Sequence, residues 1–254
     1  MGGAARTIRR LLVPVALTAV VVAAAPQFAG ADQIFQPIGH WNGKKIYLSP
    51  ARHEDAGHRG ECGTLTENQL AYFEAYDATN GNWYRGRYAP RSRWRNLRVR
   101  HYKVRIGTGT LVSAIANSNA WGATLHIPIH SNADVPNQCG RTDASRFGTL
   151  GIWRLGNSRG RDLATKLVRV LGVEAATPGT QDRPSPGTHD FTCYNPGQPC
   201  TKIDLGELRE TRATAAYMEM EFHTWNRGYD WLLTDWPWAW RFGRGIDLHL
   251  GYPR

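Results

Sequence analysis

The sequence contains few cysteines and no Cys-x-x-Cys pair among its 254 residues. The missing pair argues against a four-cysteine zinc site, which usually takes its ligands from such pairs. Internal repeats are also absent, and no apolar run after residue 25 is long enough to cross a membrane. These absences favour one globular domain without a transmembrane span.

The amino-terminal segment has the features of a secretory signal peptide. Three arginines and no acidic residue precede an apolar stretch over residues 11–25, which is shorter than a typical membrane span. Ala29-Gly30-Ala31 then matches an A-x-A cleavage site. We therefore predict a signal peptide over residues 1–31 and a secreted mature domain over residues 32–254.

The mature chain carries all four cysteines, an even number that favours two disulfides in an exported protein. Cys193 and Cys200 enclose a segment rich in proline and glycine, so we expect a local bridge between them. A long-range bridge would then join Cys62 to Cys139.

Acidic residues are outnumbered, with 21 Asp and Glu against 31 Lys and Arg, and the formal net charge is +10. Removal of the three signal arginines lowers this charge to +7. An exported basic protein meets little nucleic acid, so we expect anionic polymers or phospholipid head groups as partners instead. The alternative is that the charge serves only solubility.

Strand-like and helical patterns alternate along the mature chain. This alternation predicts an α/β fold, a single domain with a mostly parallel or mixed twisted sheet and helices on both faces. Pro128 lies inside one strand and lacks a ladder donor, so we expect that strand to be at an edge or bulged. The predicted strands cover residues 44–49, 97–106, 124–129, 149–153 and 215–222, and the helices begin near residues 64, 110 and 158, with a last one within 225–252.

His130 ends an apolar strand and is followed by Ser131-Asn132-Ala133. Such a strand delivers its last side chain to the carboxyl edge of a sheet, where ligand sites of α/β folds lie. His53, Glu67 and Glu219 are the candidate partners of this imidazole. Two histidines and one carboxylate leave the fourth position on zinc open for water, as in hydrolytic metal sites.

Each candidate also has a simpler explanation. His53 lies on a polar loop, where most histidines are surface residues. Glu67 can be the last member of a capping box, Thr64-Leu65-Thr66-Glu67. His130 can be a satisfied core histidine, and Glu219 can point to solvent at a sheet edge instead of lying buried.

In their order and local context these residues resemble the zinc-dependent N-acetylmuramoyl-L-alanine amidases of the amidase-3 type. The similarity covers roughly residues 44–250. The matching segments are Ile129-His130-Ser131-Asn132-Ala133 for the strand end with the second histidine, Gly63-Thr64-Leu65-Thr66-Glu67-Asn68 for the glutamate helix, and Tyr217-Met218-Glu219-Met220-Glu221-Phe222 for the last strand, with Arg105 and Asn119 as further matches.

The resemblance implies that His53, Glu67 and His130 hold Zn²⁺ and that Glu219 is the catalytic acid and base. The implied reaction is hydrolysis of the amide between N-acetylmuramic acid and L-alanine in peptidoglycan. The implied location is extracellular or associated with the cell wall, with peptidoglycan and anionic wall polymers as partners and no nucleic acid.

The chain departs from the family pattern at three places. The turn Ser49-Pro50-Ala51-Arg52-His53-Glu54 lacks the family's glycines, which makes His58 an alternative ligand. Glu221 replaces a small residue, and Pro128 replaces a serine. Two other functions therefore stay open: a non-catalytic wall-binding protein with a degenerate amidase fold, and a different zinc peptidase such as a carboxypeptidase.

Overall fold

The structure is a computed structural model of the chain. The predicted signal peptide, His53, His58 and the Cys193–Cys200 segment lie outside the residues that it describes. These residues are 31–51, 62–63, 65–81, 96–133, 139, 148–154, 156–173, 188–190, 205–224, 226–234 and 237–252.

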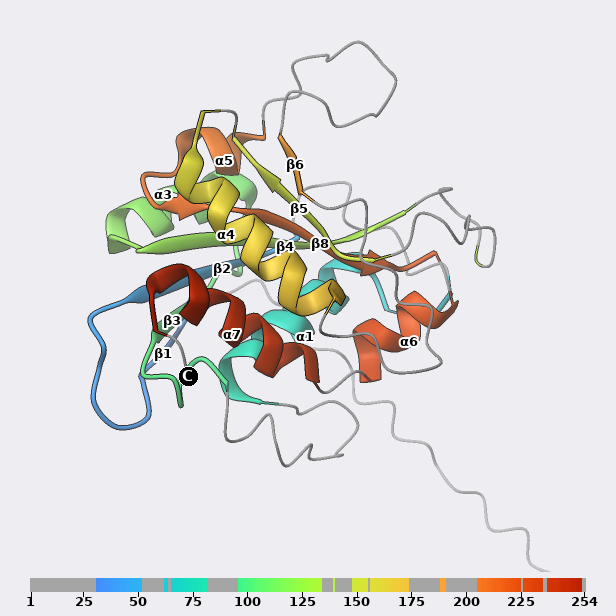
Figure 1. The fold of residues 1–254 in the computed structure, drawn as a ribbon, viewed down its shortest axis with the longest axis horizontal. Coiled ribbons are helices and arrows are strands. Elements are labelled where there is room, and N and C mark those ends of the chain that lie inside the picture. Colours follow the sequence, from blue (N-terminus) through green and yellow to red (C-terminus); the bar gives the residue numbers. More distant parts are fainter. Residues whose placement is uncertain are drawn as a thin grey trace, which may run out of the picture.

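A mixed sheet forms the centre of the domain (Figure 1). Its strand order is β1-β3-β2-β4-β8-β5-β6, and β7 pairs with β4 beside this path. The pairs along the middle are parallel, whereas β1–β3 and β5–β8 are antiparallel. The strands are β1 (Gln33–Phe35), β2 (Lys45–Pro50), β3 (Lys103–Ile106), β4 (Leu125–Asn132), β5 (Leu150–Trp153), β6 (Thr188–Asp190), β7 (Thr214–Ala215) and β8 (Tyr217–Phe222).

Helices cover both faces of this sheet, which confirms the predicted α/β architecture (Figure 1). The helices α1, α4 and α7 pack on one face around the main hydrophobic core, and α3 and α5 lie together on the other. None of the helices that the structure describes is long and apolar enough to span a membrane. The helices are α1 (Glu67–Asn80), α3 (Leu111–Trp121), α4 (Ser158–Val168) with the π-helical turn η2 (Arg169–Val173), α5 (Gly206–Glu210), α6 (Asn226–Thr234) and α7 (Pro237–Leu250).

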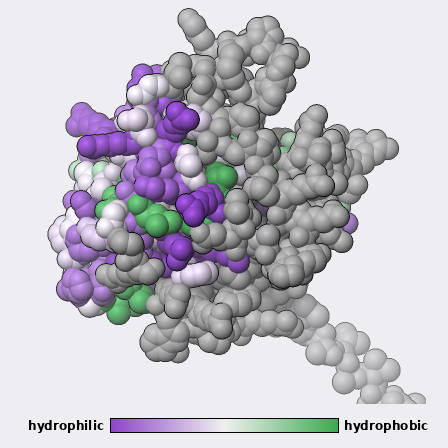
Figure 2. Space-filling view, viewed as in Figure 1, coloured by the Kyte–Doolittle hydropathy of each residue, from purple (hydrophilic) through white to green (hydrophobic). Residues whose placement is uncertain are grey.

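The central strands divide their side chains between the two faces. Ile127 and Ile129 of β4 are fully buried in the core that α1, α4 and α7 cover. Because successive side chains of a strand alternate, His126 and His130 lie on the α3 and α5 face. Seen from the side of α4 and α7, the described surface is mainly hydrophilic with small hydrophobic patches, so their apolar side chains point inward (Figure 2).

Two local predictions were wrong. Pro128 lies in the central strand β4, and the register irregularity falls between His130 and Asn132 instead. Pro128 is tolerated because β4 pairs with β7 up to His126 and with β8 only from Ile129, so no regular pair on that side requires its missing N–H.

The predicted strand over residues 97–106 is also shorter than expected, because only Lys103–Ile106 is extended. Asn96 Oδ1 accepts the backbone N–H of Val99 at 3.1 Å and holds the preceding residues in a turn. His101 ends that turn with a φ of 70°, a conformation that an extended strand does not contain.

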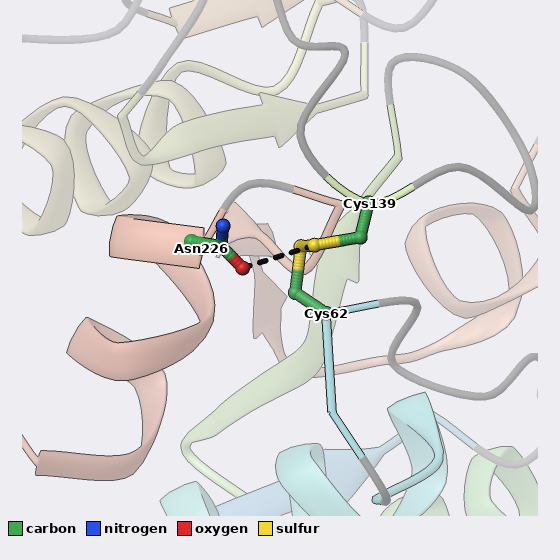
Figure 3. The surroundings of a disulfide bond; sticks show 3 residues. All are labelled: Cys62, Cys139 and Asn226. Atoms are coloured by element: carbon green, nitrogen blue, oxygen red, sulfur yellow. Dashed lines mark hydrogen bonds between the residues drawn. A yellow bond between two sulfur atoms is a disulfide. The ribbon is translucent and has the colours of Figure 1, made fainter.

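A disulfide joins Cys62 to Cys139, as predicted, across 77 residues of sequence with a Cα–Cα distance of 4.7 Å (Figure 3). The side-chain oxygen of Asn226, at the start of α6, lies 2.9 Å from Cys139 Sγ. The bridge therefore ties the segment before α1 to the segment after β4. The other predicted bridge, between Cys193 and Cys200, stays a prediction.

Candidate active site

Glu67 and His130 meet at the carboxyl edge of the sheet. Glu67 Oε1 accepts the Nδ1–H of His130 at 2.9 Å and the backbone N–H of Ser131 at 3.3 Å. Both side chains are buried. The tertiary structure thus brings together two of the three predicted metal ligands, which are 63 residues apart in sequence.

The beginning of α1 explains why the Glu67 carboxylate is available. The helix is capped by Thr66, whose side chain accepts the backbone N–H of Gln69 at 3.2 Å, while Gln69 Oε1 accepts that of Thr66 at 2.9 Å. The capping box is therefore two residues further along than predicted, and Glu67 is the first helical residue. The alternative in which Glu67 only caps the helix is wrong.

The ionisation of the pair is set by two opposing effects. Burial pushes the pKa of Glu67 upward, but the hydrogen bond and the charge of His130 outweigh it and lower that pKa. Burial likewise pushes the pKa of His130 downward, but the hydrogen bond that His130 donates to Glu67 and the charge of Glu67 outweigh burial and raise that pKa. Each group thus favours the charged form of the other across the 2.9 Å hydrogen bond between them.

A divalent cation fits this donor pair. Imidazole nitrogen and carboxylate oxygen are ordinary zinc ligands, and the Nδ1 and Oε1 atoms lie 2.9 Å apart. His53, the third predicted ligand, and His58, its alternative, lie outside the described residues. Within the described part of the chain, no three His, Cys, Asp or Glu side chains are arranged to hold a metal.

Glu219 lies opposite His130 in the neighbouring parallel strand β8. The side chain is buried, and its Oε2 has no hydrogen-bond partner among the described residues. Burial raises the pKa of Glu219 to about 7, the charge of Glu67 adds to this effect, and that of His130 opposes it. A carboxyl group with such a pKa can both accept and donate a proton near neutral pH.

Two polar residues beside the pair escaped the sequence-based prediction. Ser131 Oγ lies 2.9 Å from His223 Nδ1, and the backbone N–H of His223 donates to the Asn132 carbonyl at 3.0 Å. The charge of His223 also lowers the pKa of Glu67. Ser131 belongs to the motif segment after His130, but no role was predicted for it, and only the position of His223 four residues after Glu219 could have suggested that histidine.

The remaining residues of the resemblance have structural contacts. Glu221 Oε1 accepts the backbone N–H groups of Gly148 at 3.0 Å and Phe222 at 2.9 Å. Arg105 Nε donates to Asp32 at 2.8 Å, and Asn119 bridges α3 to the segment around α5 through the carbonyl of Glu210. These side chains hold the backbone around the site.

Solved structures with a similar fold are described as N-acetylmuramoyl-L-alanine amidases. The N-acetylmuramoyl-L-alanine amidase from Clostridium difficile 630 has a TM-score of 0.55 at 16% sequence identity. The matched region covers 82% of this chain and 95% of the amidase chain. AmiC2 of Nostoc punctiforme has a TM-score of 0.57 at 14% sequence identity, and the match covers 83% of this chain and 99% of the AmiC2 chain. Ami1 from Mycobacterium smegmatis has a TM-score of 0.56 at 11% sequence identity, and the match covers 84% of this chain and 99% of the Ami1 chain.

The chain has the fold of the N-acetylmuramoyl-L-alanine amidases. No protein-family model matches the sequence, and a search of curated proteins finds no match. The similarity is thus carried by the arrangement of strands and helices. This fold places His130 near the carboxyl end of β4, Glu219 opposite it in the parallel strand β8, and Glu67 at the beginning of α1 in contact with His130.

Proposed function

We propose that the protein is a peptidoglycan amidase that hydrolyses the amide between N-acetylmuramic acid and L-alanine. The observation that carries this proposal is the buried contact between Glu67 and His130 at the carboxyl edge, with Glu219 opposite His130. The amidase fold supports it, because similar solved structures are described as enzymes for this bond.

His53, Glu67 and His130 would hold a zinc ion in this site. When bound, zinc acts as a Lewis acid that polarises a carbonyl and lowers the pKa of water from ~15.7 to about 7. Glu67 contributes the negative charge and His130 the neutral nitrogen. The backbone N–H of Ser131 at 3.3 Å orients the Glu67 carboxylate from behind.

Glu219 would move the protons of the reaction. Its carboxylate takes a proton from the attacking water and delivers it to the departing amine of L-alanine, which is a poor leaving group unless protonated. The raised pKa of Glu219 keeps the two protonation states close in free energy near neutral pH. Burial of the carboxyl group keeps bulk water from competing for the proton.

The proposed location follows the sequence. The signal peptide over residues 1–31 directs the protein out of the cell, where it acts on the wall. The excess of basic residues over acidic ones would hold the protein near anionic wall polymers by charge attraction. Peptidoglycan itself is the proposed substrate.

Product analysis tests the proposal. Purified peptidoglycan is incubated with the mature, zinc-loaded protein, and the soluble products are identified by liquid chromatography and mass spectrometry. Release of intact stem peptides that begin with L-alanine is expected. Release of single terminal amino acids would identify a carboxypeptidase, and binding to sacculi without zinc or cleavage would identify a non-catalytic wall-binding protein.

A further inference from the structure

Exposed arginines gather at the amino edge of the central strands. They come from the segment that follows β5, from the beginning of α4, and from the end of α5 and the segment that follows it. These arginines, which we call the basic patch, are Arg154, Arg159, Arg161, Arg209 and Arg212. Seen from the side of α4, the surface over the beginning of this helix and over α5 is hydrophilic (Figure 2).

Direct contacts join the parts of the basic patch. Arg154 Nη1 donates to the carbonyl of Arg209 at 3.1 Å, which places the segment after β5 against α5. The Arg161 guanidinium lies over the ring of Trp153, 5.7 Å from the ring centroid. Because Trp153 precedes Arg154 directly, the three segments form one surface.

The basic patch lies at the opposite edge of the sheet from the candidate site. Arg212 precedes β7, which pairs with the first residues of β4. Arg154 follows β5, which runs antiparallel to β8 and ends beside its beginning. His130 is five residues beyond Leu125, the first residue of β4, or about 16 Å at the rise of a strand. A ligand can therefore occupy the patch while the candidate site holds its substrate.

Most of the positive charge of the patch is uncompensated. Arg159, Arg161 and Arg212 form no ion pair with the residues that the structure describes, whereas Arg209 pairs with Glu210. Neighbouring charges of one sign add their fields, so this surface attracts anions.

Two of the arginines occupy positions that do not stabilise their helix. Arg159 and Arg161 lie within the first four residues of α4, whose first turn contains no acidic residue. Cations are unfavourable at this end, because the helix dipole is positive there. Asp162 does not compensate them, since it pairs with Lys166 at 2.9 Å and with His249 at 2.6 Å. An anion bound to the patch would offset this unfavourable placement.

Phosphate groups match the chemistry of the patch. A guanidinium presents a planar fork of N–H donors that fits the oxygens of a phosphate, and every cation of the patch is an arginine. The large exposed apolar side chains of the described chain lie elsewhere, on the amino-terminal arm and at the beginning of α3. The patch therefore lacks the apolar side chains with which a protein enters a lipid bilayer.

We propose that the basic patch binds a linear phosphodiester polymer of the cell wall and so holds the candidate site beside its substrate. The choice of a wall polymer rests on the proposed function, which places the protein at the wall. Nucleic acids share the phosphodiester chemistry, but an exported protein meets few of them. A chain of repeated phosphates contacts several arginines at once, so its affinity falls as salt rises.

Binding of poly(glycerol phosphate) to the mature protein, measured by calorimetry at several salt concentrations, tests the patch. Arg159→Gln is expected to lower the affinity about fivefold, since a phosphate contact is lost. Replacement of Arg159, Arg161 and Arg212 together by glutamine is expected to lower it about a hundredfold. The slope of log K against log salt should then become shallower by about 2.

Arg169→Gln is the matched control. Arg169 is also exposed and follows α4 directly, so the same charge is removed ten residues, or about 15 Å, from Arg159. This variant is expected to bind the polymer as the unaltered protein does. Equal losses in the two variants would overturn the patch and show that net charge alone attracts the polymer.

Two further ligands separate the classes of partner. Polyglutamate of similar length presents carboxylates, and vesicles that contain phosphatidylglycerol present a membrane surface. Binding of either as tight as that of poly(glycerol phosphate), or no binding of the phosphate polymer, would refute the proposal. Small soluble muropeptides carry no such polymer, so failure of the unaltered protein to cut them would refute the amidase function while polymer binding stands.

Discussion

His130 of β4 and Glu219 of β8 are register partners in adjacent parallel strands, so the imidazole and the carboxyl group face the same side of the sheet. Glu67 approaches this pair from the beginning of α1. The three side chains thus come from two strands and one helix, all of them parts of the rigid scaffold. The geometry among these three side chains is therefore set by the sheet and by the docking of α1.

Glu219→Gln is expected to lower the hydrolysis rate by about 10²–10⁴ while the zinc content stays unchanged. The amide keeps the size of the carboxyl group but cannot carry the proton from water to the leaving amine. Product release from peptidoglycan and elemental analysis of the same sample check both parts. Full activity in this variant would remove Glu219 from the mechanism, and exposed Glu210→Gln is the matched control.

His130→Ala is expected to lose the bound zinc, because the imidazole nitrogen that meets Glu67 disappears. Metal content per protein chain, measured by elemental analysis after dialysis, should fall well below that of the unaltered protein. His40→Ala serves as the control, since this histidine is exposed on the amino-terminal arm. Equal zinc in the two variants would contradict the assignment of His130.

Glu74→Gln is expected to stabilise the protein at pH 8 and to have little effect at pH 4. Glu74 is fully buried, its carboxylate oxygens have no partner among the described residues, and burial raises its pKa well above the usual value. Because the folded-state pKa lies above the unfolded one, stability is full below about pH 4.5 and is lost as the pH rises toward the folded pKa.

The gain at pH 8 should be about 1–3 kcal/mol, or about 2–10 °C in Tm for a chain of this size. Thermal melts of both proteins across this pH range measure it. A constant difference between the two melting curves at all pH values would show that Glu74 does not titrate in the folded protein.

Asp32→Ala is expected to destabilise the protein by about 2–4 kcal/mol. The Asp32 carboxylate is nearly inaccessible and accepts hydrogen bonds from Tyr47, Arg105, Thr108 and Asn117. Its loss leaves the Arg105 guanidinium without its anion. Urea unfolding of the mature protein gives the value, and a change below about 0.5 kcal/mol would mean that the hydrogen bonds of Asp32 contribute little stability.

Replacement of Cys62 and Cys139 by serine is expected to lower the free energy of unfolding by up to about 4 kcal/mol. The bridge closes a loop of 77 residues, which restricts the unfolded chain. Chemical denaturation of the double variant and of the unaltered protein under identical oxidising conditions measures the loss. Unchanged stability would contradict the prediction and would mean that an unfavourable effect of the bridge in the folded state offsets its restriction of the unfolded chain.

The sequence predicted the fold class because the signals for it are local. The alternation of strand and helix patterns predicted an α/β sheet, and the apolar run before His130 predicted a buried strand, which is β4. Pro128 led to a wrong prediction, because a proline within a strand usually indicates an edge strand of the sheet. Here Pro128 lies in a central strand, at the point where β4 changes its neighbour from β7 to β8. The order of the strands in the sheet depends on which strands pair, and the sequence of a single strand carries little information about its neighbours.

The candidate site could be predicted only in part. His130, Glu67 and Glu219 were found because the chain around them resembles a known motif order. The contacts of His223 and Glu207 were not, because nothing in their local sequence marks these residues, and Ser131 was noted only as part of the segment that follows His130. Their partners lie 92 and 81 residues away, a separation at which local periodicity carries no information.

By itself the sequence determined the alternation of strands and helices, and it predicted an export signal at the amino terminus and the groups able to do chemistry. Only the tertiary structure decided that Thr66 caps α1 and that Glu67 contacts His130. It also decided that Glu207 lies near His130 and that Asp32 accepts a hydrogen bond from the turn at Thr108. The physical reason is that side-chain periodicity reports which face a residue takes, whereas the contacts of a site depend on sheet register and helix docking, which form only when the whole core packs.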